Sequence, residues 1–253
     1  MAGDTMSTGV SSRTLSCVIV LEARPAAPIA QCYIDNSWWC PPYWSDYRSD
    51  LIEALVQHVW ITVVSVAIGL LIAFPLALLA RRFPRLESVV VGATTIIYTI
   101  PSLALFSLFL PFTGLTPTTV IIGLALYSLT VLVRNVLAGL RAVPTDVRDA
   151  ALGNGYSQTG LLFHIELPLA MPVIMAGLRV ATVSTVALLT VGAIVDAGGL
   201  GNLLYLAVNN QFQAQILAAS LLCVSLAVVF DLLLVVIQRV VTPWARADTG
   251  EFS

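Results

Sequence analysis

The chain contains no lysine, so all twelve of its basic residues are arginines. A Walker A loop needs a lysine that reaches the nucleotide phosphates, and a Schiff-base enzyme needs a lysine amine. The chain by itself therefore belongs to neither class, and any ATP hydrolysis linked to it must be carried out by another protein. No motif for a bound cofactor is present.

Metal and redox motifs are also missing. The four cysteines show no C-x-x-C spacing, and the two histidines, His58 and His164, lie far apart in the sequence. With a net charge of -2 and no basic block, the chain also lacks a nucleic-acid-binding signature. Cys32 and Cys40 are eight residues apart, and this spacing leaves open both a disulfide bond and two reduced thiols.

Charge is scarce throughout. Only 10% of the 253 residues are charged and 58% are hydrophobic, whereas soluble domains carry roughly 25% charged residues. Apolar runs of about 20 residues match the thickness of a bilayer. We therefore predict an all-α integral membrane protein with five core transmembrane helices, at about 55–79, 89–110, 119–140, 173–195 and 216–241. Pro75 and Pro101 fall inside the first two spans and are expected to kink them.

Arginine placement predicts the orientation. The arginine-bearing segments are the loop after the first span (Arg81, Arg82, Arg85), the stretch between the third and fourth spans (Arg134, Arg141, Arg148, Arg179) and the end of the chain (Arg239, Arg246). The loops at 111–118 and 197–215 hold none. By the positive-inside rule, the N-terminus is expected outside and the C-terminus inside the cell.

Three regions follow from these spans. Residues 1–46 form an extracytoplasmic tail, partly disordered, that ends in an aromatic-rich interfacial segment at 33–47. Residues 47–244 form the transmembrane domain, with a cytoplasmic loop at 141–170. Residues 245–253 form a cytoplasmic tail. After the fourth span, a glycine cluster precedes a short apolar stretch, expected to be a re-entrant or surface helix.

The loop at 141–170 has a pattern of its own. Asp146 to Gly153 reads as a short helix, and Gly155 closes it. Ser157 can cap a second short helix, which we expect to end before Pro168 because a residue preceding proline is disfavoured in the α conformation. The apolar side chains of this helical hairpin suit docking into a groove of a partner protein.

The same loop resembles the EAA loop of bacterial ABC importer permeases. The matching residues, in their spacing, are Asp149, Ala150, Ala151, Gly155, Ile165, Leu167 and Pro168. Asp149 replaces the usual glutamate and keeps its charge. The resemblance implies a multi-pass protein of the bacterial inner (plasma) membrane with the five-span fold of the MetI-like type, surrounded by lipid. It also implies three kinds of partner: cytoplasmic ABC ATPase subunits that receive this loop, an extracytoplasmic substrate-binding protein, and a second permease subunit, identical or different.

Three further segments, 100–105, 134–140 and 197–201, are similar to the osmoprotectant branch of that family, which imports glycine betaine, carnitine or choline. A permease for an amino acid or another small organic solute is the first alternative. An ion-coupled secondary transporter is a second, which inverted repeats and paired intramembrane charges would favour. A membrane-bound enzyme would need catalytic polar groups clustered at one depth, and the sequence shows no such cluster.

Polar residues and helix breakers in or near the spans are the candidates for a translocation path. They are Pro101, Ser102, Asp196, Gly198, Gly199 and Asp231. Asp231 has no basic neighbour one turn away in its own span and should face another helix or a water-filled interior. The sequence leaves open both a structural pairing and a transport role for it. Arg134 and Arg179 are expected to snorkel toward the cytoplasmic face, and His58 to lie at the membrane interface.

Overall fold

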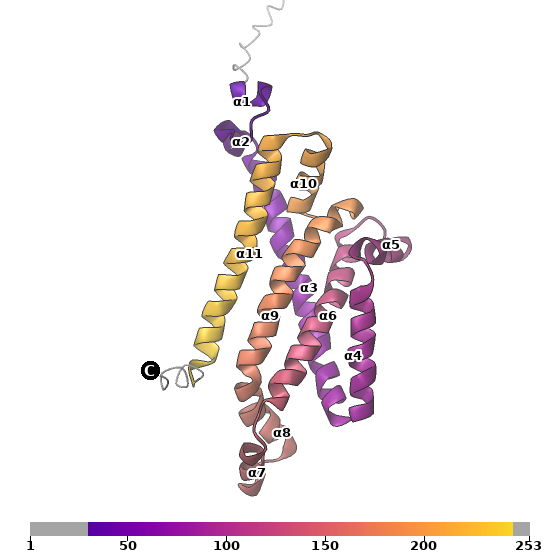
Figure 1. Ribbon diagram of the computed structural model, residues 1–253, viewed down its shortest axis with the longest axis vertical. Coiled ribbons are helices and arrows are strands. Elements are labelled where there is room, and N and C mark those ends of the chain that lie inside the picture. Colours follow the sequence, from indigo (N-terminus) through magenta and orange to yellow (C-terminus); the bar gives the residue numbers. More distant parts are fainter. Residues whose placement is uncertain (1–29, 245–253) are drawn as a thin grey trace, which may run out of the picture.

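The computed structural model describes residues 30–244, which are almost entirely helical and contain no β-strand (Figure 1). The elements, in chain order, are α1 (Gln31–Ile34), α2 (Pro41–Asp46), α3 (Arg48–Arg82), α4 (Pro84–Thr99), α5 (Ser102–Thr113), α6 (Pro117–Arg141), α7 (Thr145–Gly153), α8 (Gln158–Leu161), the π-helix η1 (Leu162–Glu166), α9 (Leu167–Leu189), the 3₁₀-helix η2 (Thr190–Val195), α10 (Leu200–Asn209) and α11 (Gln213–Val241). The predicted all-α class is confirmed. The tails at 1–29 and 245–253 lie outside the described residues.

The long helices run side by side between two ends of the molecule (Figure 1). We call the end that carries α7 and α8 the α7 end, and the opposite end, which carries α1, α2 and α10, the α10 end. Within the described residues, α3, α6, the segment from α8 to η2, and α11 are each long and apolar enough to cross a membrane. A fifth span exists if α4 and α5 are counted together, which agrees with the five predicted spans.

The second span is broken rather than kinked. The sequence predicts one bent helix at 89–110, but α4 ends at Thr99 and α5 begins at Ser102, with 95° between the two axes. The cause is Pro101, which forces Ile100 into an extended conformation with ψ of 128°. The hydroxyl of Tyr127 on α6 donates a hydrogen bond to the freed Ile100 carbonyl. Pro75, in contrast, lies within α3, which continues to Arg82.

Helix α6 is the centre of the bundle. Most residues in its most apolar stretch are buried within the protein. Four helices contact it, namely α3, α4, α5 and α9. Small residues permit this close packing, as is common between membrane helices. A Cβ at Gly69 of α3 would lie 1.9 Å from the Ser128 hydroxyl on α6, and one at Gly177 of α9 would lie 2.3 Å from the Asn135 side chain. By comparison, α11 is largely exposed at the side of the bundle.

The glycine cluster lets the turn between η2 and α10 press against α3. Gly199 has a φ of +55°, and a Cβ there would approach the Ala54 carbonyl oxygen and the His58 backbone to 2.9 Å. His58 is fully buried under this turn, with its Nε2 3.2 Å from the Val186 carbonyl oxygen. His58, expected at the membrane interface, is thus enclosed by protein rather than exposed to headgroups. Helix α10 is too short to span and lies at one end of the bundle.

A small cap precedes the first span. Cys32 and Cys40 form a disulfide bond, which resolves the alternative left open by their spacing. Within the enclosed loop, Asn36 donates to the Gln211 carbonyl at 2.8 Å and accepts from the Gln213 amide at 3.0 Å, so the cap is bound to the α10–α11 turn. Tyr43, expected at the lipid interface, is buried instead, and burial raises its pKa to about 12.

We expect the variant Gly201→Ala to destabilise the fold, because its Cβ would lie 2.4 Å from the Thr190 carbonyl oxygen, a backbone atom that cannot easily move. Overpacking of this kind costs about 1–3 kcal/mol. The matched control is Gly92→Ala in α4, where a Cβ meets no atom within 4 Å. Thermal unfolding of the purified proteins in detergent measures both, and equal midpoints would contradict the packing argument.

Candidate functional site

The hairpin of α7 and α8 projects from one end of the bundle (Figure 1). Helix α7 ends in a Schellman turn, in which the Tyr156 amide donates to the Ala151 carbonyl at 3.2 Å and the Gly155 amide to the Leu152 carbonyl at 3.0 Å. Gly155 adopts a φ of +85°, which explains why glycine stands there. Ser157 then caps α8 by accepting a hydrogen bond from the Gly160 amide at 3.1 Å, as the sequence predicts.

The hairpin differs from its prediction in one respect. The second helix does not end before Pro168 but passes through the π-helix η1 directly into α9. The wider π turn explains this, because the Leu167 amide donates to the Leu162 carbonyl five residues back, and Pro168 then lies in the first turn of α9. The hairpin and the fourth span are therefore one continuous helical segment from α8 onward.

The motif residues divide between a packed side and an exposed side. Ala151 is buried, and Ile165, Leu167 and Pro168 are half-buried, whereas Asp149, Ala150 and Gly155 are exposed. Apolar side chains are also exposed on the hairpin, namely Val147, Leu152, Tyr156 and Phe163. An exposed apolar surface on a projecting element is typical of a protein contact site.

A buried carboxylate that the sequence analysis missed holds the hairpin to the bundle. Glu166 in η1 is only 3% exposed and accepts two hydrogen bonds from Arg81 at the end of α3, at 2.6 and 2.7 Å. The Arg148 Nε of α7 lies 2.8 Å from the same carboxylate, an ion-pair contact without hydrogen-bond alignment. One acidic residue thus links α3, α7 and the start of α9. Its signal in the sequence was an isolated glutamate inside the apolar Ile165–Pro168 motif.

The structure does not bring the six candidate path residues together. Pro101 and Ser102 lie at the break between α4 and α5, whereas Asp196, Gly198 and Gly199 form the turn between η2 and α10. Asp196 is exposed and accepts a hydrogen bond from Asn202 at 3.3 Å. The two glycines are buried in packing contacts.

Asp231 lies apart from the others, inside α11, and faces Arg179 on α9. The snorkelling expected of Arg179 is wrong, because its guanidinium pairs with this carboxylate. The sequence analysis missed this partner of Asp231 because it considered only basic residues one turn away in the same span, whereas Arg179 lies on another helix. Arg134 donates to the Thr95 hydroxyl at 2.7 Å.

A helical bundle with four apolar spans, or five if α4 and α5 form one, and with a projecting hairpin defines a multi-pass membrane protein. The chain belongs to the family of binding-protein-dependent transport system inner membrane components, whose model matches residues 65–247.

Proteins with curated descriptions are similar over most of this chain and nearly all of their own length. The osmoprotectant import permease protein OsmW of Salmonella typhimurium is 34% identical over 79% of this chain and 96% of its own length. The glycine betaine/carnitine/choline transport system permease protein OpuCD of Bacillus subtilis is 33% identical over 83% and 92%. The choline transport system permease protein OpuBB of the same organism is 31% identical over 81% and 94%.

Solved structures share the fold. The MetNI methionine ABC transporter in an inward-facing conformation matches with a TM-score of 0.71 and 22% identity, over 81% of this chain and all of the matched chain. An amino acid ABC transporter solved with histidines matches with a TM-score of 0.62 and 20% identity, over 79% and 98%. These likenesses confirm the MetI-like architecture of the bundle.

We expect Glu166→Gln to destabilise the protein, because it leaves Arg81 and Arg148 together without their counter-charge. Removing one partner of a buried ion pair costs about 3 kcal/mol or more, and the share of Arg148 is smaller because its side chain is 38% exposed. Glu87→Gln is the control, since its partner Arg141 is 55% exposed and such surface pairs contribute at most about 1 kcal/mol.

Thermal unfolding in detergent compares the two variants, and limited proteolysis reports whether the α7–α8 hairpin has come loose. A Glu166→Gln protein as stable and as protease-resistant as Glu87→Gln would show that the buried carboxylate does not hold the hairpin.

Proposed function

We propose that the chain is the permease subunit of an ATP-binding-cassette importer that carries a quaternary-ammonium osmoprotectant, namely glycine betaine, carnitine or choline, into the cell. The observation that supports it most directly is that the region matching the transport family contains the projecting hairpin with the EAA-like residues Asp149, Ala150, Ala151 and Gly155. The substrate class rests on the similar permeases, which are described as choline, glycine betaine, carnitine or osmoprotectant permeases.

The hairpin is the proposed contact with the cytoplasmic ATPase subunits. Its exposed side, with Leu152, Tyr156 and Phe163, offers an apolar surface for a cleft on that partner. The arginines of the α3–α4 connection and of α7 lie at the same end, so the positive-inside rule supports a cytoplasmic α7 end and an extracytoplasmic N-terminus. Lacking lysine, the chain depends on its partner for ATP hydrolysis.

The other partners follow from the same proposal. A substrate-binding protein delivers the solute at the α10 end, where Asp196 is exposed. A second permease subunit, the same chain or a similar one, completes the path, and lipid covers exposed apolar faces such as that of α11. An amino acid permease remains the alternative, because the structural neighbours transport amino acids and share the fold.

ATP-dependent uptake tests the function. Proteoliposomes that contain the chain, its ATPase and its binding protein are expected to accumulate radiolabelled glycine betaine, carnitine or choline. A complex that assembles and hydrolyses ATP but moves none of the three would exclude the osmoprotectant assignment. Uptake without any ATPase would overturn the ATP-driven mechanism.

The hairpin turn provides a sharper test of coupling. Gly155→Ala places a side chain at φ of +85°, a conformation that costs an L-residue about 1–2 kcal/mol. We expect the solute moved per ATP hydrolysed to fall several-fold, because the turn no longer fixes α7 against α8. Gly153→Ala, where φ is ordinary and the space is open, is the control. Equal coupling ratios in the two variants would remove the turn from the mechanism.

A further inference from the structure

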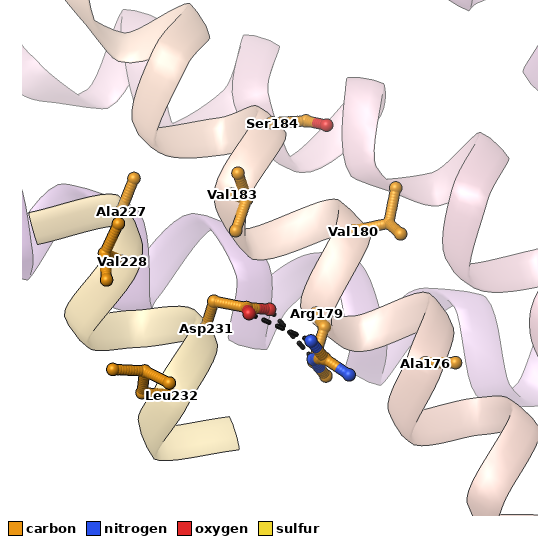
Figure 2. Close-up of a pocket in the computed structure, with 9 residues that line it drawn as sticks. All are labelled: Ala176, Arg179, Val180, Val183, Ser184, Ala227, Val228, Asp231 and Leu232. Carbon is orange, nitrogen blue, oxygen red and sulfur yellow. Dashed lines mark hydrogen bonds and ion pairs between the residues drawn. The ribbon is translucent and has the colours of Figure 1, made fainter. Parts of the chain in front are cut away.

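An ion pair connects two of the membrane-spanning helices, α9 and α11, at the side of the bundle. The Arg179 Nε and Nη2 donate to the two carboxylate oxygens of Asp231 at 2.8 and 2.9 Å (Figure 2). Arg179 lies in the middle of α9, and Asp231 lies about three turns before the end of α11. Both residues therefore lie well away from the ends of their helices, and ionisable residues inside membrane spans are costly and often mark solute or ion pathways.

The pair is not sealed by the protein around it. The side chains of Arg179 and Asp231 remain 33% and 35% exposed, so each keeps part of its polar surface available. They border a cavity of about 600 Å³ between α9 and α11. In the chain as described, the open groove leaves the pair accessible to a polar solute.

The walls of the cavity have a fitting chemistry. Val180 and Val183 of α9 and Val228 and Leu232 of α11 line it, and Ser184 adds a hydroxyl (Figure 2). Figure 2 shows Arg179 and Asp231 pointing toward each other across the gap between the two helices. The site thus presents one cation, one anion and an apolar surface suited to methyl groups.

We propose that Arg179 and Asp231 form a transient binding site for a zwitterionic solute with a carboxylate and a quaternary ammonium. The Arg179 guanidinium forms a bidentate pair with the solute carboxylate. The Asp231 carboxylate neutralises the ammonium, and the methyl groups of the ammonium contact the valines. When no solute is bound, the charges of Arg179 and Asp231 neutralise each other, so neither side chain is left as an unpaired charge in the membrane. Solute binding replaces the Arg179–Asp231 pair by two new ion pairs, one at each end of the solute. The free energy of breaking the first pair offsets part of the gain, so the solute can be released.

The proposal rests on the proposed osmoprotectant function and adds a selectivity rule to it. Glycine betaine and carnitine carry both a quaternary ammonium and a carboxylate, whereas choline carries the ammonium alone. Arg179 therefore matters for the first two solutes only, and Asp231 matters for all three. A merely structural pair would affect the three solutes by the same factor.

The test measures uptake of the three radiolabelled solutes by the reconstituted importer carrying Arg179→Gln, Asp231→Asn or both changes. For Arg179→Gln, we expect the ratio of glycine betaine to choline uptake to fall about tenfold, because a charge-assisted contact is lost for glycine betaine and not for choline. For Asp231→Asn, uptake of all three should fall. Arg134→Gln is the control, since Arg134 bonds a hydroxyl rather than a carboxylate. Size-exclusion chromatography verifies assembly of each complex.

The double variant separates recognition from structure. It removes both charges and leaves no unpaired one, so a structural role predicts restored uptake of every solute, whereas the proposal predicts that glycine betaine uptake stays low in an assembled complex. An unchanged ratio in Arg179→Gln, or full restoration in the double variant, would overturn the proposal while wild-type uptake still supported the osmoprotectant function. Wild-type protein that moves none of the solutes would overturn both.

Discussion

Inside a bilayer, every backbone polar group must find its partner within the protein, and this constraint governs the structure. The broken second span shows how it is met. Pro101 has no amide hydrogen with which to continue α4, and the Tyr127 hydroxyl on α6 donates to the Ile100 carbonyl at the break. One turn away, the Thr130 hydroxyl donates to the Thr94 carbonyl at 2.6 Å. The break between α4 and α5 is therefore possible because α6 carries hydroxyl groups beside the carbonyl groups near the break.

The same constraint separates the two ion networks of the molecule. Glu166 is almost completely covered and holds two arginines from different helices, which makes the network a structural joint. The Arg179–Asp231 pair lies farther along α9 from the hairpin and is one-third exposed beside a cavity. Burying a pair is costly, and leaving one accessible in hydrocarbon is costlier unless water or solute reaches it. The two networks therefore serve different ends, the first fixing the hairpin and the second lining a solute-accessible space.

Local patterns in the sequence predicted most of the fold and part of the candidate site. Hydropathy located the five spans, and the turn at Gly155 with the cap at Ser157 followed from rules that involve only neighbouring residues. The errors concern contacts between distant residues. Nothing near Arg179 reveals Asp231, and nothing near His58 reveals the glycine turn that covers it. The continuation through Pro168 was missed because a π turn relaxes the rule that residues before proline leave the helix.

Continuity from α8 through η1 into α9 connects the two ends of the proposed mechanism. A helix is stiff along its axis, so a displacement of the hairpin is passed on to α9. Glu166 moves with this segment and with Arg148 of α7, whereas its bonds to Arg81 of α3 must stretch or break. Arg179 is carried on α9, whereas Asp231 belongs to the loosely packed α11. A push at the hairpin would therefore shift one member of the intramembrane pair relative to the other, which is the motion that exchange with a solute requires.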